Sequence, residues 1–433
     1  MAQASRAMRL EAHRSRFVRD EEIVCSARKR AAARSDHYGR ACHRKARRTQ
    51  GLENNLVITR NCNRAYDDAY AIEGAKIGDT LRIRLPNRYN VRTGAALSAQ
   101  AYTEQRTSLA VSNQVGVDLN FTTAELTLSI DDFAERILKP ALSQVASYID
   151  NDVASGYKQM YASVGTPGTT PSTSLVLLQG QQKLNEYAAG MSPRYATVNP
   201  AANAQLVEGM KGFFNPVNTI SKQFKSGMMG EGVLGYEEIN MSQSINNHTT
   251  GSWGTGITVT STVSTQGQAT LPISFTGSSK TWNVGDVFTI GSVYQVNPQT
   301  RQSTGVLQQF VVTAAASGSS TATLDISPAI YTSSSPLATV DSFPQANATV
   351  TMLGTAATSY PQNLIYHRDA ITFATADLVM PKGVDMASRQ QYNGISIRVV
   401  RQYDINNDRL PCRLDVLYGY KVIRPEMGVR LWG

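Results

Sequence analysis

The sequence predicts an α+β protein with an inserted all-β domain, and three patterns lead to this prediction. Apolar residues recur every three or four positions between Ser129 and Gly165, which is the spacing of a helix with one buried face. Shorter runs on either side of this segment alternate apolar and polar residues, as half-buried strands do. Between residues 242 and 345 such runs follow one another at roughly ten-residue intervals. That stretch is rich in Thr, Ser, Val and Gly, and it holds only two basic and three acidic residues.

The helix predicted over residues 131–163 is the element around which the chain is organised. Ser129 and Asp131 can cap its start. Pro140 should bend or interrupt it, because proline removes one backbone donor and crowds the preceding turn. Gly165 should end it. At about 1.5 Å per residue, this helix would be a rod of roughly 45 Å that needs an extended surface to lie along.

The charge of the chain is concentrated in an arginine-rich arm, residues 1–50. This arm holds 14 basic and 5 acidic residues and so carries the whole net charge of +9, because the remaining 28 basic and 28 acidic residues cancel. Three interpretations of the arm stay open. It can bind nucleic acid, because clustered arginines neutralise phosphates. It can form a solvated helix that touches a neighbour, or it can be foreign to the natural product, since a misplaced start or a shifted frame produces such segments.

The length of 433 residues predicts two or three domains. In the first part of the body, residues 51–165, an alternating run from Leu81 to Leu85 indicates a half-buried strand that Pro86 stops. Residues 92–116 are rich in small and polar side chains and should form an exposed loop or a long hairpin. Alternation resumes at Val117 and leads into the long helix.

Residues 166–241 and 346–433 should form a second mixed region that the all-β insertion interrupts. Its predicted elements, in chain order, are a helix (Leu175–Ala188), a strand (Tyr195–Val198), a helix that starts at Asn199-Pro200, and strands on both sides of a polar turn at residues 404–408. Pro425 should end the last of these strands.

The sequence contains no motif that predicts an enzyme. GxSxG, HExxH and GxxxxGK[ST] are absent, and no GxGxxG lies at a strand–helix junction. The glycine-rich stretch Gly251–Gly256 follows polar residues and should be a flexible loop. His248 should lie in a polar loop, and His367 should form an ion pair with Asp369 at a turn. The sequence therefore predicts no catalytic residue and no cofactor.

The cysteines predict neither a metal site nor disulfides. Cys25, Cys42, Cys62 and Cys412 form no CxxC pair and no Cys/His cluster at zinc spacing, so reduced thiols are expected. No apolar run approaches the roughly 18 residues that span a bilayer. The N-terminus is too charged for a secretory signal. A soluble protein made in the cytoplasm is expected.

The C-terminal sequence LYGYKVIRPEMGVRLWG resembles the end of the coat proteins of tailed double-stranded-DNA phages. It is most similar to the short-tailed branch, whose coat protein carries a telokin-like, immunoglobulin-like insertion. Further similar stretches follow in the same order as in that family: Asn199-Pro200, Gly235–Glu237, Gly285–Ile290, Asn297-Pro298, Phe310–Thr313 and Ile326–Ile330. The resemblance covers residues 52–433, and the arm of residues 1–50 departs from it.

The resemblance implies the tailed-phage capsid fold. It implies a spine helix at residues 131–163 in a peripheral domain (51–165), an axial domain (166–241 and 346–433, the latter also returning to the peripheral domain), and the insertion at 242–345. Residues 92–116 would be an extended loop that reaches a neighbouring subunit, with Leu97, Tyr102 and Leu109 as its larger anchors. Glu104, Arg106 and Tyr102 are the candidate contact residues.

The implied function is that of a shell subunit. It would assemble with copies of itself into the hexamers and pentamers of an icosahedral capsid, in the host cytoplasm and then in the virion. The implied partners are a scaffolding protein, a portal, and packaged double-stranded DNA bound without sequence specificity, and no membrane is expected. The alternative is another β-rich virion component, a tail or decoration protein with an inserted recognition domain.

Overall fold

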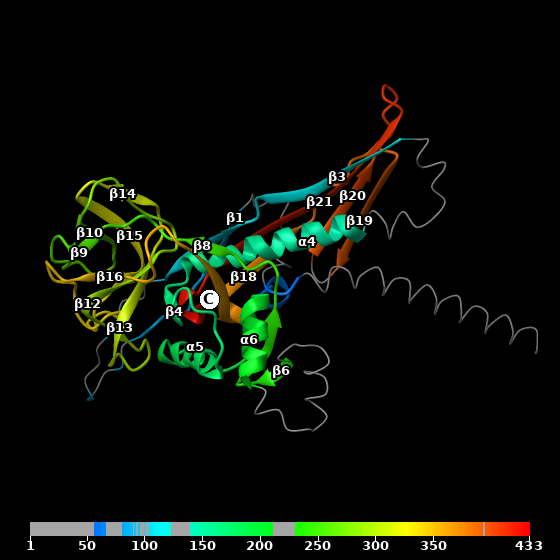
Figure 1. The fold of residues 1–433 in the computed structure, drawn as a ribbon. Helices are drawn as coiled ribbons and strands as arrows, with labels where there is room; N and C mark the ends of the chain where they lie inside the picture. Colours follow the sequence, from blue (N-terminus) through cyan, green and yellow to red (C-terminus); the bar gives the residue numbers. More distant parts are fainter. Residues whose placement is uncertain are drawn as a thin grey trace, which may run out of the picture. The chain divides into compact units, whose positions relative to one another are not determined.

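The computed structural model describes residues 56–65, 80–89, 91, 94–95, 99, 104–122, 139–210, 230–392 and 395–433 (Figure 1). The chain divides into two units, Met1–Asn54 and Asn55–Gly433, and every described residue belongs to the second. The predictions for the arginine-rich arm, for Cys25 and Cys42, for Leu97 and Tyr102 and for the start of the long helix lie outside the described residues.

The long helix is shorter at its end than the sequence predicts. Helix α4 spans Lys139–Ala154, the chain continues as a 3-10 turn, η3 (Ser155–Gln159), and strand β4 (Ala162–Val164) follows. The prediction of helix up to residue 163 is therefore wrong. Tyr157 and Tyr161 are buried and continue the three- to four-residue spacing of the helix beyond its end. This spacing therefore predicted helix where the chain has already left it. The backbone of β4 instead bonds to a sheet, and β4 is buried along its whole length.

Strand β4 is an edge strand of a seven-stranded sheet. The order of this sheet is β4-β22-β17-β5-β7-β6, and β8 pairs with the start of β17. These strands are β22 (Gly428–Trp432), β17 (Ser359–His367), β5 (Arg194–Val198), β7 (Tyr236–Met241), β6 (Gly230–Val233) and β8 (Asn247–Thr249). Helices α5 (Ser174–Glu186) and α6 (Pro200–Met210) confirm the two helices predicted there, and β5 confirms the predicted strand.

Strand β22 was not expected, because Pro425 was predicted to end the last strand. Pro425 instead starts a one-turn 3-10 helix, η6 (Pro425–Met427), which redirects the chain into β22. All five residues of β22 are buried, and β17 and β4 pair with it on either side. Gly428 allows this close approach, since a Cβ there would lie 2.4 Å from Met160 Sδ.

A five-stranded sheet is built around the long strand β21 (Arg409–Val422). Strands β18 (Ile371–Ala376) and β20 (Ile395–Arg401) pair with successive parts of one side of β21, β19 (Met386–Tyr392) pairs with β20, and β3 (Asn113–Thr122) pairs with β21 on the other side. The strands predicted on both sides of the turn at residues 404–408 are confirmed. Asp152 of α4 accepts hydrogen bonds from Tyr418, Tyr420 and Asn113, and these bonds hold the helix to the sheet.

Much of the predicted loop at residues 92–116 is strand in its described part. Strand β1 (Thr80–Arg84) pairs with β2 (Arg106–Ala110) as a long-range antiparallel hairpin, so the partner of β2 lies outside the range predicted as a loop or hairpin. Leu109 is fully buried in its own chain, in a cluster with Ile83 and Ala374. Its prediction as an anchor for a neighbouring subunit is wrong, because its side chain already fixes the hairpin to the five-stranded sheet.

The insertion is a small antiparallel barrel. Its strands are β9 (Thr255–Val259), β10 (Gln268–Thr276), β12 (Val287–Val296), β13 (Ser303–Val312), β15 (Thr321–Ile330) and β16 (Val350–Met352), in the order β16-β12-β13-β15-β10-β9. A bridge between Thr258 and Thr349 joins the two ends of this order and closes the barrel. Trp282 of the short strand β11 (Lys280–Trp282), which pairs with β14 (Ala316–Gly318), fills the interior together with Phe288 and Phe310. The alternating runs predicted between residues 242 and 345 are all found as strands. The last strand of the barrel, β16, lies beyond residue 345, where the sequence was expected to leave the insertion.

No helix in the described residues is long and apolar enough to cross a membrane. Cys62 and Cys412 are free and buried.

Candidate functional site

The two described candidate contact residues, Glu104 and Arg106, bind each other within one chain. Glu104 Oε2 accepts from Arg106 Nη2 at 2.8 Å and from Nε at 3.2 Å, and Glu104 Oε1 accepts from Arg84 Nη1 at 3.2 Å. The arginine side chains are 54% and 72% exposed, respectively, whereas that of Glu104 is 19% exposed. The carboxylate is therefore largely engaged, while both guanidinium groups remain accessible.

The outer face of the β1–β2 hairpin carries an excess of positive charge. Arg84 lies directly opposite Arg106 in the register, and Arg82 lies two residues away on the same exposed face. In the described part of this face, three arginines stand against one carboxylate, that of Glu104. Like charges opposite each other in an antiparallel pair repel. This hairpin face therefore favours contact with a negatively charged group.

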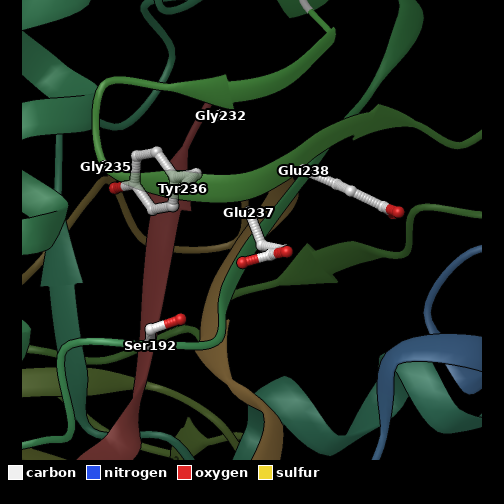
Figure 2. A pocket seen from close by; sticks show the side chains of 6 residues that line it. All are labelled: Ser192, Gly232, Gly235, Tyr236, Glu237 and Glu238. Atoms are coloured by element: carbon white, nitrogen blue, oxygen red, sulfur yellow. The ribbon is translucent and has the colours of Figure 1, made fainter.

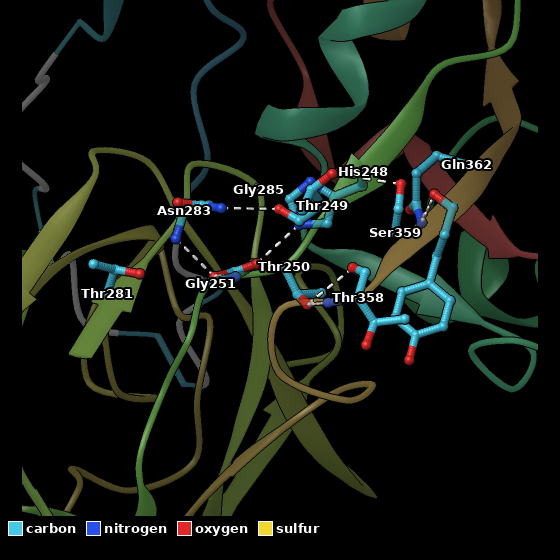
Figure 3. A network of polar contacts seen from close by, with 12 residues as sticks. His248, Thr249, Thr250, Gly251, Thr281, Asn283, Gly285, Thr358, Ser359 and Gln362 are labelled. Atoms are coloured by element: carbon cyan, nitrogen blue, oxygen red, sulfur yellow. Dashed lines mark hydrogen bonds and ion pairs between the residues drawn. The ribbon is translucent and has the colours of Figure 1, made fainter. Parts of the chain in front are cut away.

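A buried polar network joins the barrel to the seven-stranded sheet (Figure 3). The strand that enters the insertion, β8, pairs with the start of β17, the strand that leaves it, through Thr249 opposite Ser359. Asp286 of the barrel lies beside this ribbon and is 1% exposed. Its Oδ2 accepts from the backbone N–H groups of Asn283 at 2.7 Å and of Gly251 at 3.1 Å. Gly251 is held tightly, because a Cβ there would lie 2.3 Å from the Thr281 carbonyl oxygen, so the expectation of a flexible glycine loop is wrong at this position.

His248 belongs to this network and not to a polar loop as predicted, since it lies in β8 and is 2% exposed. Its Nε2 lies 2.9 Å from Asp286 Oδ1, and its Nδ1 lies 3.3 Å from the Tyr157 hydroxyl. Burial lowers the pKa of His248, although the hydrogen bond to Asp286 acts against this. The neutral ring satisfies both contacts when Nε2–H donates to Asp286 and the Tyr157 hydroxyl donates to Nδ1.

Arg430 of β22 joins the sheet to the barrel from the other side. It is fully buried, its Nε donates to Gln362 Oε1 at 2.9 Å, and its Nη1 donates to the Gly285 carbonyl of the barrel. Its guanidinium lies 5.0 Å from the ring centroid of Tyr157 and 5.1 Å from that of Trp432. Burial lowers the pKa of Arg430 to about 10, which leaves it charged at neutral pH. Two aromatic faces and two oxygens thus stabilise a buried cation.

Glutamines of the barrel make the remaining polar contacts of this junction. Gln309 Oε1 accepts from the Ser163 N–H at 2.7 Å, and Gln309 Nε2 donates to the Ser163 carbonyl at 3.0 Å. One amide therefore satisfies both outward-facing backbone groups of an edge strand, β4. Gln308 accepts from the Tyr187 hydroxyl at 3.4 Å, and Gln295 accepts from Lys183 Nζ at 3.2 Å. The barrel and the seven-stranded sheet are consequently joined by a polar interface in which most groups are paired.

An open pocket of about 580 Å³ lies at the β6–β7 hairpin (Figure 2). Ser192, Gly232 and Gly235 line it together with Tyr236, Glu237 and Glu238, and Figure 2 shows the Ser192 and Glu237 side chains turned towards each other. Glu238 is already bound to Arg60 at 2.6 Å and to Asn240 at 2.9 Å. Burial acts to raise the pKa of Glu238, but these partners outweigh it and hold that pKa below its usual range.

The other residues considered for chemistry have structural contacts. His367 caps a 3-10 turn, η5 (Arg368–Ala370), because its Nδ1 accepts from the Asp369 N–H at 3.2 Å. The two side chains meet at a turn as predicted, with Nδ1 3.7 Å from Asp369 Oδ2, but a nitrogen that accepts a hydrogen bond cannot also donate to the carboxylate, so the predicted ion pair does not form through it. Within the described ranges, no three His, Cys, Asp or Glu residues are grouped so as to hold a metal ion. Arg430 and Asp286 were not predicted from the sequence. In the sequence, each is a single charged residue within a mainly apolar stretch, and this is the one feature that could have pointed to it.

Two sheets and a barrel are thus joined by buried polar groups, most of which are paired. The family model "P22 coat protein - gene protein 5" matches residues 48–433, so the chain belongs to the P22 coat protein family. It is a phage major capsid protein, with a structural and non-enzymatic role in an icosahedral capsid. This assignment favours a shell subunit over a tail or decoration protein. The match begins at residue 48, so the arginine-rich arm lies almost entirely outside it.

One curated relative and several solved structures are similar to the chain. The major capsid protein of Acyrthosiphon pisum secondary endosymbiont phage 1 is 22% identical over 342 residues, which cover 75% of this chain and 80% of the relative. A structure of Mycobacterium phage Che8 covers 87% of this chain and 90% of its own, with 12% identity and a TM-score of 0.46. The mature capsid of bacteriophage PhiM1 covers 82% of each chain, with 11% identity and a TM-score of 0.39. The assignment rests on the family match, because TM-scores below 0.5 carry no argument of their own.

Proposed function

We propose that this chain is the repeating shell subunit that forms the hexamers and pentamers of a phage capsid around packaged double-stranded DNA. The observation that carries the proposal is the family match over residues 48–433, which spans both sheets and the barrel. The way the barrel is joined to the sheet fits this role, because a subunit that tiles a closed surface must present its contact faces in fixed positions.

The proposed partners follow from the resemblance to tailed-phage coat proteins. A scaffolding protein would guide assembly in the host cytoplasm, a portal would occupy one vertex, and DNA would be enclosed without sequence-specific contacts. The charge balance supports the last point, because the body from Gly51 onward holds 28 basic and 28 acidic residues. A formally neutral body gives no general attraction for a polyanion.

The proposed contact residues between subunits are Glu104, Arg106 and Tyr102. In this proposal the hairpin face that carries Arg84 and Arg106 meets a negatively charged surface of the next subunit. Replacing both Glu104 and Arg106 by alanine should scarcely change the melting temperature of the isolated subunit, because exposed ion pairs contribute about 0.2–1 kcal/mol each. The same change should weaken shell formation or make it more sensitive to salt, because each shell repeats the contact many times.

A matched pair elsewhere in the chain provides the control. Arg389 Nη1 lies 3.3 Å from Asp377 Oδ2, and these side chains are 40% and 28% exposed. Replacing this pair by alanine removes a similar ion pair and should leave the salt dependence of assembly unchanged. If the Glu104/Arg106 variant assembled like the control, or if it lost several kcal/mol of subunit stability while assembling normally, these residues would not be inter-subunit contacts.

A further inference from the structure

The first described residues form a short strap that crosses the molecule where its two sheets meet. Residues 56–64, called the strap below, contain one 3-10 turn, η1 (Thr59–Asn61). Leu56, Ile58 and Cys62 of the strap are buried, so it is an integral part of the fold. Its polar contacts reach three different parts of the body.

The centre of the strap is held by a single buried carboxylate of α4. Asp150 Oδ1 accepts from the backbone N–H groups of Ile58 at 2.8 Å and of Thr59 at 2.9 Å, and from Thr59 Oγ1 at 3.0 Å. Asp150 is fully buried, and its Oδ2 has no hydrogen-bond partner among the described residues. Burial raises the pKa of Asp150, although these hydrogen bonds act against the shift. A charge at this position is costly, and in the part of the chain that the structure describes its hydrogen-bonded groups belong to the strap.

The two flanks of the strap are bonded to different sheets. Arg60 Nη2 donates to Glu238 Oε2 of the seven-stranded sheet at 2.6 Å. Asn63 forms a parallel bridge with Thr372 of the five-stranded sheet: the Asn63 N–H donates to the Ile371 carbonyl at 2.9 Å, and the Phe373 N–H donates to the Asn63 carbonyl at 3.0 Å. The strap therefore connects both sheets within a few residues.

Two of the covalent connections between these sheets are short. Strand β17 continues through η5 into β18, and β21 continues through η6 into β22. The two turns are bonded to one another by Ile423 N–H, which donates to the Ala370 carbonyl at 3.0 Å. Two adjacent short connections of this kind make a hinge, since few residues have to change conformation for the sheets to rotate.

We propose that the strap, when Asp150 holds it in place, restricts rotation at this hinge. The strap thereby sets the angle between the two sheets. With the strap held, Arg60 and Asn63 fix both sheets to one segment; with the strap released, this direct link between the sheets is lost. Resting on the proposed function, this gives a shell subunit a means of changing shape between positions that are not equivalent. The device itself belongs to the isolated subunit and can be tested there.

Cys62 provides a built-in probe of strap release, because it is fully buried in the strap, while Cys412, buried in β21, serves as an internal control. Alkylation of the full-length subunit, read per cysteine by mass spectrometry, should be at least about tenfold faster at Cys62 in Asp150→Ala than in the unchanged protein. Asp150→Asn keeps an acceptor oxygen for the same three donors and should react at nearly the normal rate. Asp286→Ala, which removes a buried carboxylate at the barrel junction, controls for general destabilisation.

The angle between the sheets is measured by the distance between spin labels attached at Gln205 of α6 and Asn120 of β3, both exposed. Cys25, Cys42 and Cys62 are replaced by serine in this experiment, because a released Cys62 would also take up label. Asp150→Ala should shift or broaden this distance, and Asp150→Asn and Asp286→Ala should not. If Asp150→Ala does not fold, Thr59→Val removes one of the three donors and should give a two- to threefold change at Cys62. An unchanged Cys62 rate, or a faster rate with an unchanged distance, would overturn the proposal. Neither readout requires shells, so a failure to assemble would count against the proposed function alone.

Discussion

The amide of Gln309 should contribute measurably to holding the barrel on the seven-stranded sheet. Gln309→Ala removes two hydrogen bonds to the Ser163 backbone, each contributing about 1 kcal/mol. Ser163 is 3% exposed, so its N–H would also lose its partner in a buried place, at a further cost of about 1–3 kcal/mol. We expect a total loss of about 3–5 kcal/mol, and accelerated hydrogen exchange at Ser163.

Denaturant unfolding and site-resolved hydrogen exchange measure this loss. Gln302→Ala changes an exposed glutamine just before the same strand and should stay within about 0.5 kcal/mol of the unchanged protein. If both variants lost the same small amount and Ser163 stayed protected, the Gln309 amide would not be what satisfies the edge of β4.

Gln309→Glu gives a second, pH-dependent readout of the same contact. One carboxylate oxygen can accept from the Ser163 N–H, but the other would face the Ser163 carbonyl oxygen, and only the protonated acid can donate to it. The folded state should therefore raise the pKa of Glu at position 309 above its unfolded value of about 4.3. Stability should increase as pH falls through this raised pKa towards 4.3, and the gain should be lost as pH rises back through the raised pKa. A pH-independent difference from the unchanged protein would refute the proposed geometry.

Three further predictions concern other parts of the chain. Asp415→Asn should cost about 2 kcal/mol at pH 7 by thermal unfolding. The difference should vanish as pH falls through the folded pKa of Asp415, because hydrogen bonds from two arginines outweigh burial and hold that pKa below its usual value. A fragment of residues 242–359 should fold with dispersed amide NMR signals, whereas residues 242–345 lack β16 and should be less stable. A chain that starts at Leu52 should melt like the full chain, but one that starts at Asp67 lacks the strap and should melt at a lower temperature.

The sequence predicted those elements whose burial pattern matches one regular period. The barrel strands alternate cleanly because one face packs into a closed interior, as Leu271, Ile273 and Phe275 do in β10. Helix α5 was predicted from the spacing of its apolar residues. The end of α4 was predicted wrongly, because Tyr157 and Tyr161 continue the helical spacing although the backbone leaves the helix after Ala154 and then pairs with β22. Strand β22 was missed since all five of its residues are buried, which leaves no alternation to read.

The junction and the strap could not be predicted from local patterns. His248 and Asp286 are 38 residues apart, and Asp150 and Thr59 are 91 apart, so neither pair produces a motif. The charge pattern selected Glu104 and Arg106 as residues that could pair with charges on a neighbouring subunit. It could not show that the Glu104 carboxylate binds two arginines of its own hairpin. Side-chain contacts between such distant residues depend on which strands lie next to each other in the folded protein. Local sequence patterns do not determine this.

Electron microscopy of the purified protein tests the central claim most directly. The chain is expressed alone and together with its phage's scaffolding protein, and the assemblies are sized and imaged in negative stain. A shell subunit should give closed, capsid-sized particles built of hexamers and pentamers, uniform in diameter when the scaffold is present. A discrete small oligomer under both conditions, with no shells or capsomers, would contradict the assignment of this chain as the repeating unit of a capsid.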